Sequence, residues 1–286
     1  MRLTVDHLRR CAFFASLITA PIGSGSIRAD PAGGSIALAS HLAIYDLKLA
    51  DSRGKRALET VQGRIVYDFS SACEGYGLKF RQVTQLNSEG KSAMSDLRAT
   101  SWEDVAAKSF RFHSQNFLDE HLVEAVDGNA ERQLEGVAIR LTKPEEKKFE
   151  AGQVVFPTEH MRQIIAAARA GKSLLQVSVY DGSDNGQKVY NTLSVIGQAI
   201  PPEKATPSPD PSTTNAQMKL LTRWPVTVSY YDRDVKKKDG EQTPVYAMSF
   251  ELFENGVSRA LVLDYNDFVI SGALGKFDVK DAKPCK

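Results

Sequence analysis

The sequence predicts a mainly β protein, built as one large antiparallel sheet with one short amphipathic helix. Segments of alternating apolar and polar residues, rich in β-branched and aromatic side chains, recur along most of the chain. Turn-forming sequences separate them at 51–55, 87–91 and 127–129. Only one segment has helical spacing. Because short turns join sequence neighbours as hairpins, the strands should form an antiparallel meander.

The expected strands fall into two groups on either side of the helix. Each matches the period of two that places alternate side chains on opposite faces of a sheet. The first group comprises 41–50, 61–69, 76–86, 108–115, 121–126 and 134–141, and the second comprises 174–180, 188–197, 223–232, 245–254 and 257–274. Asn255-Gly256 between the last two is a strong signal for a two-residue hairpin.

The helix is predicted over 158–170. Thr158 is expected to cap it, and Gly171 to end it as the residue that tolerates a left-handed conformation. A single apolar stripe with spacing i, i+3, i+4, i+7 faces one side and comprises Met161, Ile164, Ile165 and Ala168. This stripe must pack on a sheet. It either fills the hollow of a curved sheet or closes an apolar ligand cavity.

The chain is expected to form one domain over 30–286. Residues 199–217 are rich in proline, serine and threonine and poor in apolar bulk, which predicts an extended surface loop. A domain boundary there would leave the last strands as a small sheet with open edges. We therefore expect one continuous sheet that contains a Pro-rich loop at 199–217.

The first 29 residues are typical of a cleaved signal peptide. Arg9 and Arg10 precede a short apolar stretch, which small residues follow up to Ala29. The stretch is shorter than the roughly 18–20 residues of a membrane span. We therefore expect export to the periplasm and no transmembrane segment in the mature chain.

The charge of the mature chain argues against binding to nucleic acid. Removal of 1–29 leaves 32 basic and 34 acidic residues, a net charge of about −2. Nucleic-acid binding surfaces carry a clustered basic excess. The only basic cluster, 236–238, lies between two aspartates and is typical of a solvated hairpin tip.

Two cysteines remain after the signal peptide, Cys73 and Cys285. In an oxidising compartment such a pair is expected to form a disulfide. The alternatives are a thiol nucleophile or half of a metal site. The chain has neither a CxxC motif nor the His–Cys spacing of a zinc site.

Recognisable catalytic motifs are missing from the sequence. The chain has no G-x-S-x-G elbow, no Gly-rich phosphate loop and no histidine pair with metal-ligand spacing. His160 in the first helical turn is expected at the surface. Trp102 and Trp224 are expected to seal the sheet ends, the alternative being a ligand platform. We therefore expect no catalytic residues, no metal and no cofactor.

The order and spacing of four segments resemble the EipB family of periplasmic cell-envelope integrity proteins. These segments are 154–175, 179–197, 223–232 and 246–272, and the positions of both cysteines agree as well. The resemblance covers the chain from about His41 to Cys285. It implies a spiral, open-barrel-like β-sheet, a disulfide between Cys73 and Cys285, and a role in envelope integrity under stress without known catalysis.

Two functions follow as hypotheses. The first is a non-enzymatic periplasmic protein, expected to be a monomer, that binds another envelope protein through a free strand edge. The second is a carrier or sensor of a lipid or lipoprotein acyl chain, in a hollow partly filled by the helix. The partner or lipid is not identified by the sequence.

Overall fold

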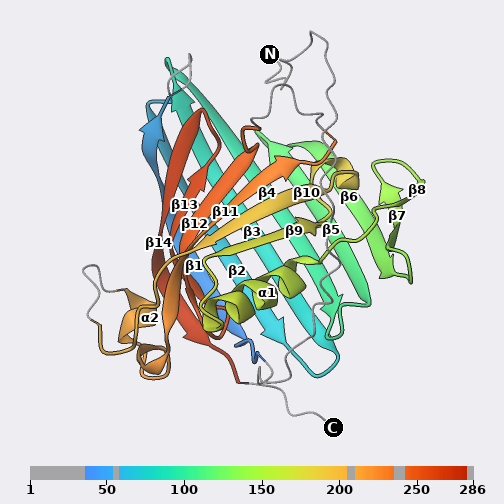
Figure 1. Ribbon diagram of the computed structural model, residues 1–286. Helices are drawn as coiled ribbons and strands as arrows, with labels where there is room; N and C mark the ends of the chain where they lie inside the picture. Colours follow the sequence, from blue (N-terminus) through green and yellow to red (C-terminus); the bar gives the residue numbers. More distant parts are fainter. Residues whose placement is uncertain (1–35, 54–57, 205–209, 235–241, 282–286) are drawn as a thin grey trace, which may run out of the picture. The chain divides into compact units, whose positions relative to one another are not determined.

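The computed structural model describes residues 36–53, 58–204, 210–234 and 242–281, which belong to one compact unit. These residues form fourteen antiparallel strands in a single open sheet (Figure 1). The first eight strands are β1 (His41–Ser52), β2 (Thr60–Ser71), β3 (Gly75–Ser88), β4 (Lys91–Asp104), β5 (Ser109–Leu118), β6 (His121–Arg132), β7 (Val137–Lys143) and β8 (Lys147–Glu150). The other six are β9 (Leu174–Val179), β10 (Tyr190–Ile196), β11 (Arg223–Asp232), β12 (Tyr246–Phe253), β13 (Ser258–Asp264) and β14 (Phe268–Val279). The predicted fold class, mainly β with an open antiparallel sheet, is confirmed.

The strand order places the two ends of the described chain in the middle of the sheet. From one edge to the other the order is β8-β7-β6-β5-β4-β3-β2-β1-β14-β13-β12-β11-β10-β9. β1 pairs with β2 on one side and with β14 on the other. Two meanders thus meet at the β1–β14 ladder, and the expected continuity of the sheet across the Pro-rich loop is what the structure has.

The helices lie between the strands in sequence. α1 (Pro157–Arg169) connects β8 to β9, and a 3-10 turn, η1 (Asp184–Gly186), lies between β9 and β10. The Pro-rich segment contains α2 (Pro211–Thr214), and η2 (Met218–Leu220) follows it directly. Ser212 and Met218 are fully buried. The end of this segment is therefore packed, although its composition predicted a poorly packed loop.

The apolar core lies on the inner face of the curled sheet. The alternation in β1 places Ala43, Tyr45 and Leu47 on this face, and all three are buried. A second cluster joins the inner face of β5–β7 to residues that follow β8 and β9. It includes Phe110, Phe112, Phe156 and Tyr180, whose rings contact one another at centroid distances of 5.3–5.6 Å.

The predicted turn at 127–129 is wrong. These residues lie inside β6, and the chain turns after it, where the Gln133 amide donates to the Gly136 carbonyl at 2.7 Å. Gly128 serves close packing instead. A Cβ at this position would lie 2.8 Å from the Phe112 ring and 2.9 Å from Leu141. A glycine inside a strand often marks such a close approach rather than a turn.

Two strands were not predicted, and one segment was predicted as a single strand where the structure has two. β4 alternates small and polar residues on its inner face, including Ala93, Ser95 and Ala99, so its apolar period is weak. β8 has only four residues. The predicted strand 257–274 is divided by a turn at Tyr265–Asp267 into β13 and β14.

The packing at Gly128 gives a test of the fold. Gly128→Ala should lower the free energy of unfolding by about 1–3 kcal/mol, because the added methyl group overpacks the cluster around Phe112. Gly275→Ala is the matched control, since its Cβ would meet only the end of the flexible Asp46 side chain. Denaturant unfolding of both variants measures the difference. Equal stabilities would contradict the close packing at Gly128.

Candidate functional site

The predicted stripe of α1 is part of the core. Ile164, Ile165 and Ala168 are buried, and Met161 is half-buried. The cluster around them contains Leu38, Phe69, Tyr76, Ile196, Trp224, Val226, Val228 and Leu252. Leu38 precedes β1, and the other residues come from β2 and β3 on one side and from β10–β12 on the other. The stripe therefore holds the two halves of the sheet together.

A carboxylate from a distant strand caps α1. The prediction that Thr158 caps the helix is wrong, because the helix begins at Pro157 and Phe156 is its N-cap residue. The free amides of Thr158 and Glu159 donate to the two carboxylate oxygens of Glu103 in β4, each at 2.7 Å. A negative charge at this position also opposes the positive end of the helix dipole. Glu103 is only 3% exposed, and burial raises the pKa of its carboxyl to about 7.

Arg132 fixes the same end of the helix from β6. Its guanidinium donates to Glu159 at 2.6 Å, to the Val154 carbonyl at 3.1 Å and to the Ala107 carbonyl at 2.8 Å. It also lies over the Phe156 ring, 5.2 Å from the centroid. Arginine suits this position because its planar group donates in several directions at once. The start of α1 is therefore tied to β4 and β6, whereas its apolar stripe packs in the cluster with residues of β2, β3 and β10–β12.

His160 lies in the core rather than at the surface, so this expectation is wrong. Its ring lies near the hydroxyls of Thr192 and Ser194 on β10, with Nε2 3.4 Å from each. Burial lowers the pKa of His160 to about 4. The imidazole is therefore neutral at physiological pH, and its part is to satisfy buried polar groups beneath the helix.

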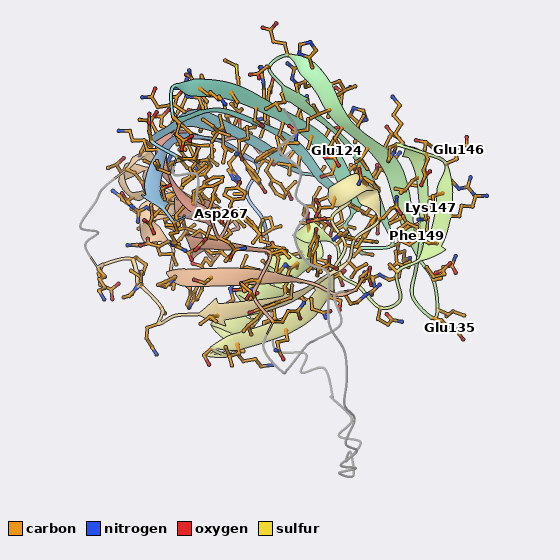
Figure 2. All side chains as sticks on the ribbon, turned by 90° about the horizontal axis from the view of Figure 1, so that it is seen from above. Glu124, Glu135, Glu146, Lys147, Phe149 and Asp267 are labelled. Carbon is orange, nitrogen blue, oxygen red and sulfur yellow. The ribbon has the colours of Figure 1, made fainter. Side chains whose placement is uncertain are left out.

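The two edges of the sheet differ in chemistry. β8 is four residues long, and Lys147, Lys148 and Glu150 on it are exposed. Figure 2 shows Glu146, Lys147 and Phe149 together at this end of the sheet. Short, charged edge strands resist pairing with another chain. The β8 edge is therefore protected against strand addition.

The β9 edge is only partly covered. Val155 forms a parallel bridge there, donating to the Ser178 carbonyl at 2.8 Å and accepting from the Tyr180 amide at 3.0 Å. Since paired residues alternate along an antiparallel strand, the main-chain groups of Leu174 and Gln176 face the same free side. Among the described residues, none forms a hydrogen bond with these groups. This part of β9 can accept an added strand.

Apolar side chains flank the free part of β9. Leu174 and Val195 are cross-strand partners, 57% and 45% exposed, on the outer face of β9 and β10. Pro225 on β11 is also exposed nearby in the sheet order. We call Leu174, Gln176 and Val195 the β9 edge site. Main-chain groups with adjacent exposed apolar side chains are what peptide recognition by strand addition uses.

The environment of Cys73 agrees with the predicted disulfide, but Cys285 lies outside the described residues. Cys73 is exposed in the turn between β2 and β3. The Lys280 amide donates to the Ser40 carbonyl at 2.8 Å, and the Ser71 amide donates to the Ser40 hydroxyl at 2.8 Å. The chain after β14 thus leaves the sheet beside the turn that carries Cys73. The Cys73–Cys285 pairing remains a prediction.

The sequence indicated some parts of these sites and not others. The stripe and the strand at 174–180 were predicted, but Glu103 and Arg132 were missed. Both are charged residues in strands, and only their burial against the helix distinguishes them. An acidic residue at an inward position of a strand is the one signal that could have identified Glu103.

No helix in the described part of the chain combines the length and the apolar character needed to cross a bilayer. Within the same residues, no group of three metal-ligating side chains lies close enough to hold an ion.

The Glu103 cap predicts a pH-dependent stability. Its pKa is raised from 4.5 to about 7, so the folded protein keeps a proton that the unfolded chain loses between these values. Its contribution to stability is thus greatest below pH 4.5 and decreases as the pH rises to 7. The stability of Glu103→Gln relative to wild type should therefore increase between pH 5 and 8, by at most about 3 kcal/mol. The titration of His160 affects the stability of both proteins equally, so it cancels in the difference between them.

Denaturant unfolding of both proteins at pH 5, 6, 7 and 8 measures this difference. Glu131→Gln, an exposed carboxyl on β6, is the matched control and should show no such trend. A difference between Glu103→Gln and wild type that does not change with pH would contradict a raised pKa.

The predicted disulfide also has a direct test. Cys73→Ser should lower the free energy of unfolding by about 2–5 kcal/mol without unfolding the sheet, because a bond to Cys285 would close a loop of over 200 residues. Melting curves with and without dithiothreitol check this. The reductant should bring wild type to the level of the variant and leave Cys73→Ser unchanged. If dithiothreitol has no effect on wild type, the bond is absent.

The fold and the sequence are similar to those of known proteins. The sequence profile of the EipB-like family matches residues 32–281. The chain is 35% identical over 274 residues to the cell envelope integrity protein EipB of Brucella abortus (strain 2308), over 95% of each chain. A crystal structure of a β-barrel-like protein of domain of unknown function DUF1849, from Brucella abortus, is similar with a TM-score of 0.78 and 34% identity, over 86% of this chain and 100% of that one. The chain therefore belongs to the EipB-like family.

Proposed function

We propose that this protein maintains the cell envelope from the periplasm by binding an extended segment of another envelope protein at the β9 edge site. The role in the envelope is inferred from the relative named cell envelope integrity protein EipB. The periplasmic location is inferred from the signal-peptide pattern of residues 1–29, which lie outside the described residues. The protein acts without catalysis and as a monomer.

The observation that carries the proposal is the free part of β9. Leu174 and Gln176 present unpaired main-chain groups, beside the exposed side chain of Val195. A partner segment of four or five residues would pair with these groups and place alternate apolar side chains against Leu174 and Val195. Main-chain pairing would supply affinity, and the apolar contacts would supply specificity.

The alternative function, a carrier of a lipid or acyl chain, was suggested by the apolar stripe of α1, and the structure uses this stripe in the core. It required the stripe of α1 to border a ligand cavity. Ile164, Ile165 and Ala168 instead pack against side chains of β10–β12 and of β2–β3. Since the stripe is used in the core, the protein partner is the better-supported function.

A proline substitution tests whether a partner strand pairs with the β9 edge site. Gln176→Pro removes an amide that faces away from β10, so the ladder of the sheet is kept while strand addition is blocked. In cells that lack the gene and grow under envelope stress, this variant should restore survival at least tenfold less well than wild type. Lys148→Pro, at an edge-facing position of the charged β8 edge, is the matched control and should restore survival fully.

A second pair of variants keeps every main-chain hydrogen bond. Val195→Asp should impair survival as Gln176→Pro does, whereas Val262→Asp, also exposed on the outer face, should not. A photo-crosslinking residue at 176 should give a discrete protein adduct that is missing when the residue is placed at 148. Full rescue by both Gln176→Pro and Val195→Asp would refute binding at this edge.

A further inference from the structure

The outer face of the sheet, opposite to α1 and the core, carries a continuous groove. Three adjoining depressions of about 690, 430 and 440 Å³ lie on it and share lining residues. Thr100 lines all three, and His113 lines two of them. The register shows that the floor is one row of cross-strand partners from β2 to β6, continued by Thr142 of β7: Asp68, Lys79, Thr100, His113 and Asp127. We call this row with its borders the outer groove.

The length of the outer groove follows from the spacing of the strands. Asp68 lies on β2 and Thr142 on β7, and neighbouring strands are about 4.8 Å apart, so the groove extends about 24 Å across the sheet. It runs across the strands rather than along them. A linear oligomer several units long would fit along it.

The groove has cations that lack an acidic partner. Among the described residues, no carboxylate forms an ion pair with Lys79 or Arg111. Arg81 and Arg98 both pair with the single carboxylate of Asp96, at 2.9 and 2.6 Å. Charge complementarity therefore favours a ligand that carries negative groups.

Trp102 and Arg111 form a rigid border of the groove. The guanidinium lies over the indole ring, 4.6 Å from its centroid. The ring itself lies close over Gly75, where an added Cβ would be 2.9 Å from it. A stacked arginine is held in one orientation and still presents its N–H edge, a geometry that suits a carboxylate.

The remaining groups suit hydroxyl groups of a ligand. The Asp127 carboxylate is fixed by His113 Nδ1 at 2.9 Å and by the Thr142 hydroxyl, which donates at 2.9 Å. Thr100 and Asn129 add a hydroxyl and an amide to the lining. Such fixed donors and acceptors, placed beside an aromatic ring, recognise polar ligands by hydrogen bonding rather than by apolar burial.

The sheet itself argues against a peptide in this groove. The strands beneath it pair with neighbours on both sides, so no main-chain edge is free for strand addition. We propose that the outer groove binds a carboxylate-bearing glycan strand of the cell wall. This inference rests on the proposed periplasmic location but not on a partner at the β9 edge site.

Binding to cell-wall glycan tests the proposal. The probe is the soluble, carboxylate-bearing fragments released from purified peptidoglycan by a muramidase, added to the full mature protein with Trp224→Phe. Trp102 is then the only tryptophan. Its fluorescence should change on addition of the fragments, and a neutral chitooligosaccharide of equal length should bind at least tenfold more weakly. Equal binding of the neutral oligosaccharide would overturn the assignment of an acidic ligand.

Charge reversal locates the site. Lys79→Glu with Arg111→Glu should weaken binding at least tenfold. Lys48→Glu, an exposed residue on the outer face of β1, should leave it unchanged. Co-sedimentation with intact peptidoglycan gives the same comparison in the protein with both tryptophans, in case Trp224→Phe disturbs the core.

The two proposals can fail separately. Gln176→Pro should bind the fragments as wild type does, since β9 is far from the groove in the strand order. Wild type that neither binds the fragments nor sediments with peptidoglycan would overturn the glycan proposal and leave the β9 edge proposal standing. Equal affinity of wild type and the charge-reversed variant for the fragments would also overturn the glycan proposal and leave the β9 edge proposal standing.

Discussion

The structure depends on how an open sheet buries its inner face without closing its hydrogen-bonded ladder. In the described residues β8 and β9 are the two ends of the sheet, and neither pairs with the other. The apolar residues between them must be covered by something else. α1 and the segment before it do this, because Phe156 packs with Phe110 of β5 while Ile164 and Ile165 pack with β10–β12 residues. Side-chain packing thus takes the place of a last row of hydrogen bonds.

The helix can do this only if its first turn is fixed. Amides at the start of a helix lack intrahelical partners, and leaving them buried and unpaired would be costly. Glu103 reaches this turn from β4 and accepts from the amides of Thr158 and Glu159, while Arg132 of β6 donates to the Glu159 side chain. The same arrangement places a carboxyl where burial opposes its charge. Stability is therefore coupled to pH through a buried residue on the inner face of the sheet.

An open sheet also leaves surfaces that a closed barrel would not have. The β9 edge keeps free main-chain groups because Val155 covers only its end, whereas the β8 edge is short and charged. The outer face of β2–β7 has every strand paired and offers only side chains. These two surfaces therefore favour different partners, an extended peptide at the edge and a polar oligomer across the face. A protein that joins two envelope components could use both.

The sequence by itself determined those elements that a short segment specifies, namely most strands, the turn that contains Gly256 and the apolar stripe of the helix. Alternation predicted most strands. Asn255-Gly256 lies in the predicted turn, with Gly256 at a φ of 87°, but the loop has three residues rather than two, because the Phe253 amide donates to the Val257 carbonyl. Gly171 follows the helix with a φ of 69°, as predicted from its tolerance of this conformation. The stripe from Met161 to Ala168 was likewise predicted from spacing alone.

The tertiary structure decided what depends on partners distant in sequence. Gly128 is a packing glycine rather than a turn residue because Phe112 and Leu141 approach it. Glu103 rather than Thr158 caps the helix because β4 carries it to the first turn. The row from Asp68 to Asp127 becomes a groove only through the register of five strands. Sequence patterns report the period of one segment, whereas these features arise from contacts between segments that only the complete sheet brings together.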